Sequence, residues 1–242
     1  MEWNDEGIIL SARGHGETST IVELFTREQG RHLGLVRGGR SRRMRPILQA
    51  GNHVDATWRA RLAEHLGYLT LELKHGYAAE VIEKPKMLAG LMSLCALARL
   101  LPERDPHPSL YEVTLFVLGY MNDDAVWPAL YVRWELALLD ELGVGLDLES
   151  CAATGSIEDL FYVSPKSRRA VSRAAGAPYA DKLLALPRFL RRDRGGSSTP
   201  RDVADGLKLT GYFLERDVLT PRDIAMPEPR RRLTRYVATP DR

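Results

Sequence analysis

The sequence contains only two cysteines, Cys95 and Cys151, among 242 residues. Two cysteines cannot build a disulfide framework, and an apolar stretch such as the one around Cys95 usually holds a buried free thiol. Long hydrophobic runs are also lacking. The longest, residues 87–101, includes Arg99 and is shorter than the roughly 20 residues that a membrane span needs. The first residues are polar and acidic, unlike a secretory leader. We therefore expect a cytoplasmic protein.

Sequence signatures of common enzymes are absent as well. There is no Gly-Lys dipeptide and so no P-loop, no Gly-x-Ser-x-Gly elbow, and no His-Glu-x-x-His pattern. Gly14 and Gly16 lack the third glycine of a dinucleotide-binding loop. The acidic pairs at 123–124 and 140–141 are typical of solvated helix surface. We predict no catalytic residue, so an enzyme is the least supported class.

Acidic residues are missing from Gln29 through Val54, and this stretch holds an unusual concentration of arginine. Five guanidiniums lie within nine residues: Arg37, Arg40, Arg42, Arg43 and Arg45. Arginine offers forked donors that match phosphate oxygens and a planar face that stacks on bases. Such a loop repels itself unless an extended anion neutralises it, which favours nucleic acid as the ligand. The alternative is a solvated loop with no ligand.

The formal charge of +2 conceals blocks of opposite sign. Residues 27–61 carry 9 arginines against 2 acids, residues 86–160 carry 4 basic and 12 acidic residues, and residues 161–242 carry 18 basic and 9 acidic residues. The net charges are therefore +7 (9 − 2), −8 (4 − 12) and +9 (18 − 9). Different faces are expected to meet different partners. In the last block, a secondary phosphate-binding patch is expected at Arg188, Arg191 and Arg192. The basic region around it is joined by Lys166, Arg168, Arg169 and Arg173, with Arg230, Arg231 and Arg232 near the end. A solvated basic face is the alternative.

The first 80 residues have the pattern of short strands. Alternating or β-branched segments bounded by turn residues predict strands at 7–12, 19–26, 31–36, 53–60 and 68–73. Five strands with a basic loop after the third fit a small closed barrel. The OB-fold, which holds single strands with a basic face and stacking aromatics, is the commonest of these. An SH3-like barrel has the same strand pattern and stays open at this point.

The rest of the chain is predicted to be helical. Apolar residues spaced by three and four predict helices at 86–101, 109–121 and 128–142. A last helix is expected to start at Thr199, with Pro200 in its first turn and Asp202 completing a capping box. Residues 146–198 form an irregular insert between these helices. The predicted fold is α+β, with a nucleic-acid-binding barrel at 1–80 and a helical domain at 81–242.

The insert begins with a sequence that resembles half of a zinc site. A zinc ribbon needs two Cys-x-x-Cys pairs, and only Cys151 stands at a ligand position. Its partner positions are occupied by Thr154, Ser172 and Ala175. One thiolate cannot close a tetrahedral site, so we expect a degenerate zinc-ribbon region, no metal and no cofactor.

Arg133 is the only basic residue between Arg104 and Lys166. It stands in the apolar helical stretch 133–139. An arginine beside apolar helices can capture the carboxylate of a peptide tail. The alternative is an intramolecular ion pair with Asp140.

Several of these segments together resemble the RecO family of bacterial recombination-mediator proteins. The matching pieces are Gly7-Ile8-Ile9-Leu10, Gly16-Glu17-Thr18-Ser19 before Leu24-Phe25-Thr26, Gly30-Arg31, Gly38-Gly39-Arg40-Ser41-Arg42 before Leu48-Gln49, Arg133-Trp134-Glu135-Leu136 with Gly143, Cys151 and Tyr162-Val163-Ser164-Pro165. Their order holds over nearly the full length. The resemblance implies an N-terminal OB-fold and a helical C-terminal domain. Many relatives carry four zinc-binding cysteines, of which only Cys151 remains here.

The resemblance also implies a function. It implies binding of single- and double-stranded DNA, annealing of complementary strands and partnership with RecR. It further implies docking of the C-terminal tail of single-strand-binding protein, with Arg133 at the family position associated with the tail-binding pocket. Together these activities load RecA onto coated DNA. We therefore predict a nucleoid-associated DNA repair mediator that binds phosphates through Arg37, Arg40, Arg42, Arg43, Arg45, Arg59 and Arg61.

Two other classes of function remain open. An RNA- or ribosome-associated OB-fold protein would use the same basic loop. A protein-interaction adaptor would act through its helices, and its arginines would be incidental.

Overall fold

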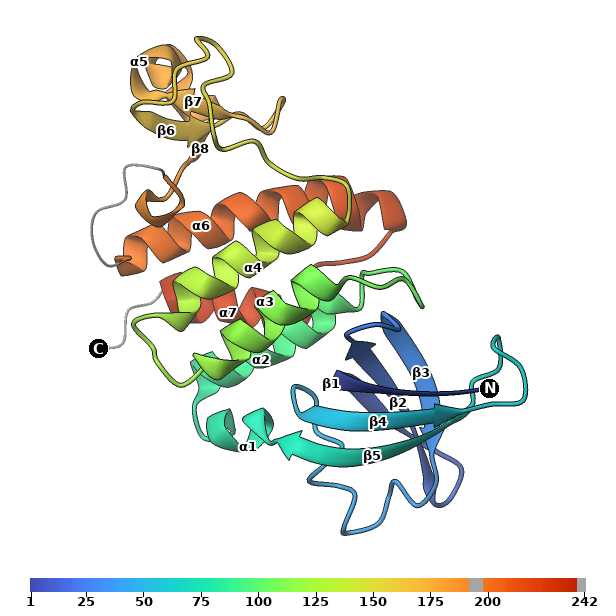
Figure 1. The fold of residues 1–242 in the computed structure, drawn as a ribbon. Helices are drawn as coiled ribbons and strands as arrows, with labels where there is room; N and C mark the ends of the chain where they lie inside the picture. Colours follow the sequence, from blue (N-terminus) through green and yellow to red (C-terminus); the bar gives the residue numbers. More distant parts are fainter. Residues whose placement is uncertain (192–197, 239–242) are drawn as a thin grey trace. The chain divides into compact units, whose positions relative to one another are not determined.

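A computed structural model describes residues 1–191 and 198–238 of the chain. The chain divides into two compact units, Met1–Asn122 and Asp123–Arg242. The first unit starts with the strands β1 (Glu2–His15), β2 (Ser19–Thr26), β3 (Arg31–Val36), β4 (His53–Arg59) and β5 (Tyr68–His75). They close into a barrel with the order β1-β2-β3-β5-β4 (Figure 1). The α+β class and the five-stranded barrel of the OB-fold are thereby confirmed.

Strand β1 closes the barrel because it is long enough to pair on both sides. Residues Glu2–Ile8 pair with β4, and Gly7–His15 pair with β2. The sequence predicted only residues 7–12 of this strand, because the residues before Gly7 are mostly polar and none of them is fully buried. Their hydrogen bonds to β4, rather than apolar alternation, define the start of the strand.

The barrel core follows the predicted alternation on most strands. Val54, Ala56 and Trp58 of β4 are buried with Leu69 and Leu71 of β5. The prediction was wrong for the last apolar residue of β5, Leu73, which is 45% exposed. The register between the two strands shifts between His53 and Val54, at the pair that Val54 forms with Leu73. The extra residue on β5 is Lys74, which follows Leu73, so regular pairing of the two strands ends just beyond this position.

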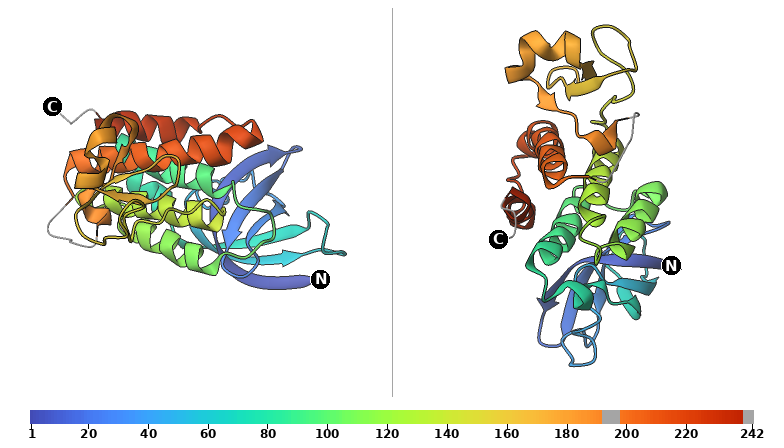
Figure 2. Two further views of the ribbon diagram at one scale, coloured as in Figure 1. Left: turned by 90° about the horizontal axis from the view of Figure 1, so that it is seen from above. Right: turned by 90° about the vertical axis from the view of Figure 1, so that its left-hand side faces the viewer.

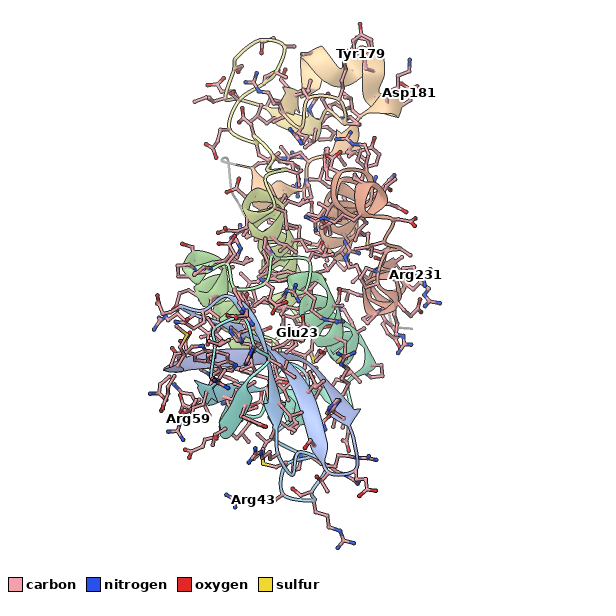
Figure 3. All side chains as sticks on the ribbon, turned by 90° about the vertical axis from the view of Figure 1, so that its right-hand side faces the viewer. Glu23, Arg43, Arg59, Tyr179, Asp181 and Arg231 are labelled. Carbon is pink, nitrogen blue, oxygen red and sulfur yellow. The ribbon has the colours of Figure 1, made fainter. Side chains whose placement is uncertain are left out.

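Three helices follow the barrel in the first unit: α1 (Tyr77–Val81), α2 (Pro85–Ala98) and α3 (Pro108–Gly119). The strand-to-helix change therefore falls near residue 80, whereas the compact unit extends to Asn122. A buried carboxylate, Glu23 of β2, explains part of this packing: it accepts a hydrogen bond from Arg99 Nε at 2.7 Å and pairs with Arg31. Figure 3 places Glu23 on the side of the barrel that α2 covers. Cys95 of α2 is buried, as predicted, and burial raises its pKa to about 12.

The second unit contains the helices α4 (Trp127–Glu141), α5 (Arg173–Gly176), α6 (Pro200–Phe213) and α7 (Glu228–Ala238). The 3-10 turns lie at Ala177–Lys182, Arg188–Leu190 and Thr220–Arg222, and a π-helical turn lies at Leu214–Leu219. The predicted capping box at the start of α6 is present: Thr199 accepts from the Asp202 N–H at 3.1 Å, and the Asp202 carboxylate accepts from the Thr199 N–H at 3.1 Å. None of the helices in the described part of the chain is long and apolar enough to cross a membrane.

Two expectations for this unit were wrong. The insert is not wholly irregular, because it contains a three-stranded sheet of β6 (Leu160–Val163), β7 (Ala170–Ser172) and β8 (Leu184–Ala185) in the order β7-β6-β8. These strands are too short for a period of two to be recognised in the sequence. Helix α6 is also not the last one. Helix α7 follows it and was missed because its arginine-rich sequence has little apolar content.

Helix α7 lies beside α6 (Figure 2). It packs through a buried arginine, Arg230. Arg230 is 2% exposed and lies 2.5 Å from the carboxylate of Glu135 on α4, which is fully buried. It also donates to the carbonyl oxygen of Leu207 on α6 at 2.8 Å, and the Thr210 hydroxyl donates to Glu135. The suggestion that Arg230 belongs to a phosphate-binding patch is therefore wrong, because its guanidinium is buried and hydrogen-bonded inside the second unit.

Candidate nucleic-acid interface

The residues between β3 and β4, 37–52, form the arginine loop. Its apolar side chains hold it to the barrel: Leu48 is buried in the core, and Met44 and Ile47 pack against it. Backbone hydrogen bonds join its end to β1, from Ile9 N–H to Asn52 O at 2.9 Å and from Gly51 N–H to Ile9 O at 2.7 Å. The loop therefore has a fixed conformation, in which one side faces the core and the other faces solvent.

The start of the arginine loop lies against the β1–β2 hairpin. The Arg40 N–H donates to Thr18 O at 3.1 Å, and the Arg40 guanidinium donates to Gly16 O at 3.0 Å. Gly39 is required here because a Cβ atom at this position would lie 2.6 Å from the Thr20 hydroxyl oxygen. A groove of about 370 Å³ runs between loop and hairpin, and Arg40 and Arg45 line it.

The predicted phosphate ligands of the loop share two properties. All are exposed, and within residues 1–191 and 198–238 none forms an ion pair with a carboxylate. They are Arg37, Arg40, Arg42, Arg43 and Arg45. Figure 3 shows Arg43 projecting away from the barrel. The positive charge of the loop is thus left for an external anion to neutralise.

The other two predicted ligands differ in their surroundings. Arg61 is exposed in the β4–β5 loop. Arg59 is 66% exposed and pairs with Glu2 at 2.8 Å. This bond holds the pKa of Glu2 below its usual value. Both side chains are open to water, so the pair contributes little stability and a phosphate can compete with Glu2 for the guanidinium.

The structure brings Arg37 and Arg59 to one aromatic ring that the sequence had not singled out. Tyr68 opens β5 and pairs directly with Arg59 of β4. The Arg37 guanidinium lies 4.1 Å from the centre of the Tyr68 ring. An outward-facing aromatic residue at the start of a strand, near a basic loop, is the signal that could have identified it.

Strand pairing gathers these segments at one end of the barrel. Thr20 at the start of β2 pairs with Val36 at the end of β3, so the β1–β2 hairpin and the arginine loop are adjacent. Leu35 also pairs with Tyr68, which brings the β4–β5 loop to the same end. The candidate interface therefore consists of three neighbouring loops.

The outer face of β1, β4 and β5 has the opposite charge. A groove of about 550 Å³ on this face is lined by Asp5, Glu6, Asp55 and Glu72, with Lys74 as its one cation. Lys74 is paired with Glu6 at 2.7 Å. This face would repel phosphates, whereas the end of the barrel that carries the loops would attract them.

The predicted secondary patch is only partly available. Arg188 is exposed. Arg191 donates twice to Leu186 O, at 2.9 and 2.6 Å, and lies 4.6 Å from the centre of the Phe161 ring. Arg192 lies outside the described residues. The contacts of Arg191 hold the insert together and leave less of its guanidinium for phosphate.

Arg133 does not form the alternative ion pair with Asp140 in the described part of the chain. Its guanidinium donates to Phe189 O at 2.5 Å and lies 5.9 Å from the centre of the Phe189 ring. The side chain is exposed. It therefore has remaining donors for a carboxylate of another molecule.

The surroundings of Cys151 do not fit a zinc ion. Cys151 is 1% exposed, and its sulfur lies 3.5 Å from the Ser172 hydroxyl and accepts from the Ser172 N–H at 3.3 Å. Burial raises the pKa of this thiol, but hydrogen bonds from Thr154, Ser172 and Ala153 outweigh burial and lower it to about 6. Hydroxyl groups replace ligand thiolates here. Among the residues that the structure describes, no group of three or more His, Cys, Asp or Glu could hold a metal.

Comparison with known proteins covers both units. The profile of the family described as "Recombination protein O N terminal" matches residues 1–77, and "Recombination protein O C terminal" matches residues 82–223. A protein of Methylobacterium nodulans is 57% identical over 234 residues, with 95% of each chain covered. One of Methylocella silvestris is 56% identical over 232 residues, covering 96% of this chain and 94% of its own. One of Brucella abortus is 53% identical over 230 residues, covering 95% and 93%. Each is named DNA repair protein RecO.

Proposed function

This chain belongs to the RecO family of DNA repair proteins, and we propose that it is a recombination mediator that binds DNA through the arginine loop. The observation that carries the proposal is the set of five exposed arginines that have no carboxylate partner among the described residues, held on a loop whose other side is fixed in the barrel core. Ordered cations on a rigid support bind phosphates with little loss of conformational entropy. Arg59 and Arg61 extend the same surface across the end of the barrel.

The same charges account for strand annealing. Two complementary strands repel each other through their phosphates, and a protein that neutralises both lowers that repulsion. The groove between the arginine loop and the β1–β2 hairpin gives one strand a path beside Arg40 and Arg45, while Arg42 and Arg43 face outward. This activity needs no nucleotide and no covalent step, so we propose a non-enzymatic role. The contacts are to phosphate, so duplex and single strands both bind.

Its proposed partners follow from the family and from Arg133. We place the C-terminal carboxylate of the single-strand-binding protein tail on the exposed Arg133 guanidinium beside Phe189. RecR is the proposed partner in loading RecA onto the coated strand. Arg188 and Arg191 are proposed as secondary contacts.

An annealing assay tests the proposal. Complementary strands are mixed with the protein, either bare or coated with single-strand-binding protein. The wild-type protein is expected to accelerate annealing in both cases. The variant Arg133→Ala is expected to anneal bare strands normally and to fail on coated strands, whereas loss of annealing on bare strands contradicts the role of Arg133. Competition by RNA of the same sequence as strongly as by DNA would instead favour an RNA-associated protein.

A further inference from the structure

We propose that Tyr68 and Arg37 form a stacking platform for an unpaired nucleobase. The inference rests on the proposed function and deepens it, because it names the chemical feature by which the barrel distinguishes single strands from duplex. The arginine loop recognises phosphates, which both forms of DNA carry. Tyr68 recognises the flat face of a base, which only an unpaired strand exposes.

The geometry at Tyr68 is that of an open platform. Its neighbour Leu69 points into the core and is 4% exposed, so the Tyr68 side chain points outward, and 46% of it is exposed. The guanidinium of Arg37 lies 4.1 Å from the ring centre, within stacking range. A base can therefore extend the stack, with the guanidinium also supplying charge close to the adjoining phosphate.

The platform is rigid because its supports are buried. Gly67, which precedes Tyr68, has a φ of 65°, and a Cβ atom there would lie 2.4 Å from Trp58 Nε1. The Trp58 Nε1–H donates to Leu66 O at 3.0 Å, and the Leu35 N–H donates to Gly67 O at 3.0 Å. Tyr68 is thus held by the barrel rather than by a loose loop. Little entropy is lost when a base stacks on it.

The surroundings of Tyr68 favour an unpaired strand. Its cross-strand neighbour is the cation Arg59. Leu62 and Leu66 of the β4–β5 loop are 47% and 38% exposed and add apolar surface near the ring. Cations for the backbone and apolar surface for bases thus occur together here, whereas the groove farther along the outer face is acidic and its cation, Lys74, is paired with Glu6. The combination is typical of single-strand sites and is tolerant of sequence, because every base has a flat face.

The experiment compares Tyr68→Ala with Tyr68→Phe, which keeps the ring and serves as the matched control. Binding is measured by fluorescence anisotropy to a single strand, a duplex of the same length and an abasic strand with the same number of phosphates. We expect Tyr68→Ala to weaken single-strand binding about 5- to 150-fold, the loss of one stacked base. Binding to the duplex and the abasic strand should stay within about twofold, and the salt dependence should not change. Tyr68→Phe should bind like the wild type.

Two results overturn the inference. One is unchanged single-strand affinity in Tyr68→Ala. The other is an equal loss on all three ligands, which indicates a structural or electrostatic effect. A variant Tyr68→Leu, which keeps apolar bulk at the position, gives the same comparison if the alanine variant does not fold. Failure of the proposed function looks different: removal of Arg40, Arg42 and Arg43 then leaves binding to all three ligands unchanged.

Discussion

Replacing Arg40, Arg42 and Arg43 together with alanine should weaken DNA binding without weakening the fold. The three side chains are exposed, and in the described part of the chain none is paired with a carboxylate. The residues that hold the loop to the core are others, chiefly Leu48, Met44 and Ile47. The perturbation therefore removes three charges and one exposed hydrogen bond, from the Arg40 guanidinium to Gly16 O, and keeps the apolar support of the loop.

The size of the effect follows from counterion release. Each phosphate contact to a single strand contributes about 0.7 to the slope of log affinity against log salt, so loss of three contacts lowers the slope by about 2. Salt concentrations of 0.1 M and 1 M differ by one log unit, so a slope of about 2 corresponds to about 2 log units of affinity. The three contacts should therefore increase affinity about 100-fold at 0.1 M salt. Exposed substitutions usually change stability by less than about 0.5 kcal/mol each. The melting temperature is therefore expected to change by no more than a few degrees.

The assay is a titration of a labelled single strand at several salt concentrations, with thermal unfolding measured on the same samples. The matched control removes three exposed positive charges elsewhere, by Lys182→Ala, Arg201→Ala and Lys208→Ala in the second unit. The control should keep the wild-type slope. Equal slopes for the wild type and the loop variant would refute the reasoning, as would an equal loss in the control, because net charge alone would then explain the binding.

Three further predictions concern the fold around these sites. Arg230→Met should lower the free energy of urea unfolding by about 3–5 kcal/mol because it leaves Glu135 buried without a partner; adding Glu135→Leu should recover much of the loss, and no recovery would contradict the ion-pair account. Gly39→Ala should lower stability by about 1–3 kcal/mol and also weaken DNA binding, because its Cβ atom meets the Thr20 hydroxyl; wild-type values in both assays would show that the close approach is not needed. In the folded protein the pKa of Cys151 is lowered to about 6, below the pKa of this thiol in the unfolded chain. The thiolate therefore contributes its full stabilisation at pH values above the unfolded-state pKa, and this contribution is lost as the pH falls through about 6. The difference in unfolding free energy between wild type and Cys151→Ala should accordingly be larger at pH 9 than at pH 6, and a difference independent of pH would contradict the hydrogen-bonded thiolate.

The barrel could be predicted from the sequence because its strands are half buried. Alternation placed Val54, Ala56 and Trp58 in the core, and turn residues marked the ends of the strands. Pairing is harder to predict: the first residues of β1 are polar, and only the partner strand β4 makes them a strand. The bulge that follows Leu73 is likewise not recorded in any local pattern of the sequence.

The candidate site was predictable to the extent that it depends on charge density. The arginines between positions 37 and 45 stand out in the sequence because no acidic residue lies near them. Whether an arginine meets a carboxylate depends on tertiary structure. In the described part of the chain the loop arginines meet none, whereas Arg230, one of three consecutive arginines that look alike in sequence, is buried against Glu135. Tyr68 was missed for the same reason, since its contact with Arg37 joins residues 31 positions apart (68 − 37).

The most direct test of the central claim is photo-crosslinking from a single position of the arginine loop. A benzophenone side chain placed at position 43, which projects from the loop in Figure 3, is compared with one at position 179, where Tyr179 is 59% exposed in the second unit. Each protein is irradiated with a labelled single strand at low and at high salt. The account predicts a crosslink from position 43 that disappears at high salt and is stronger than any from position 179. A crosslink from position 179 alone, or none from the loop under conditions where the protein binds DNA, would contradict it.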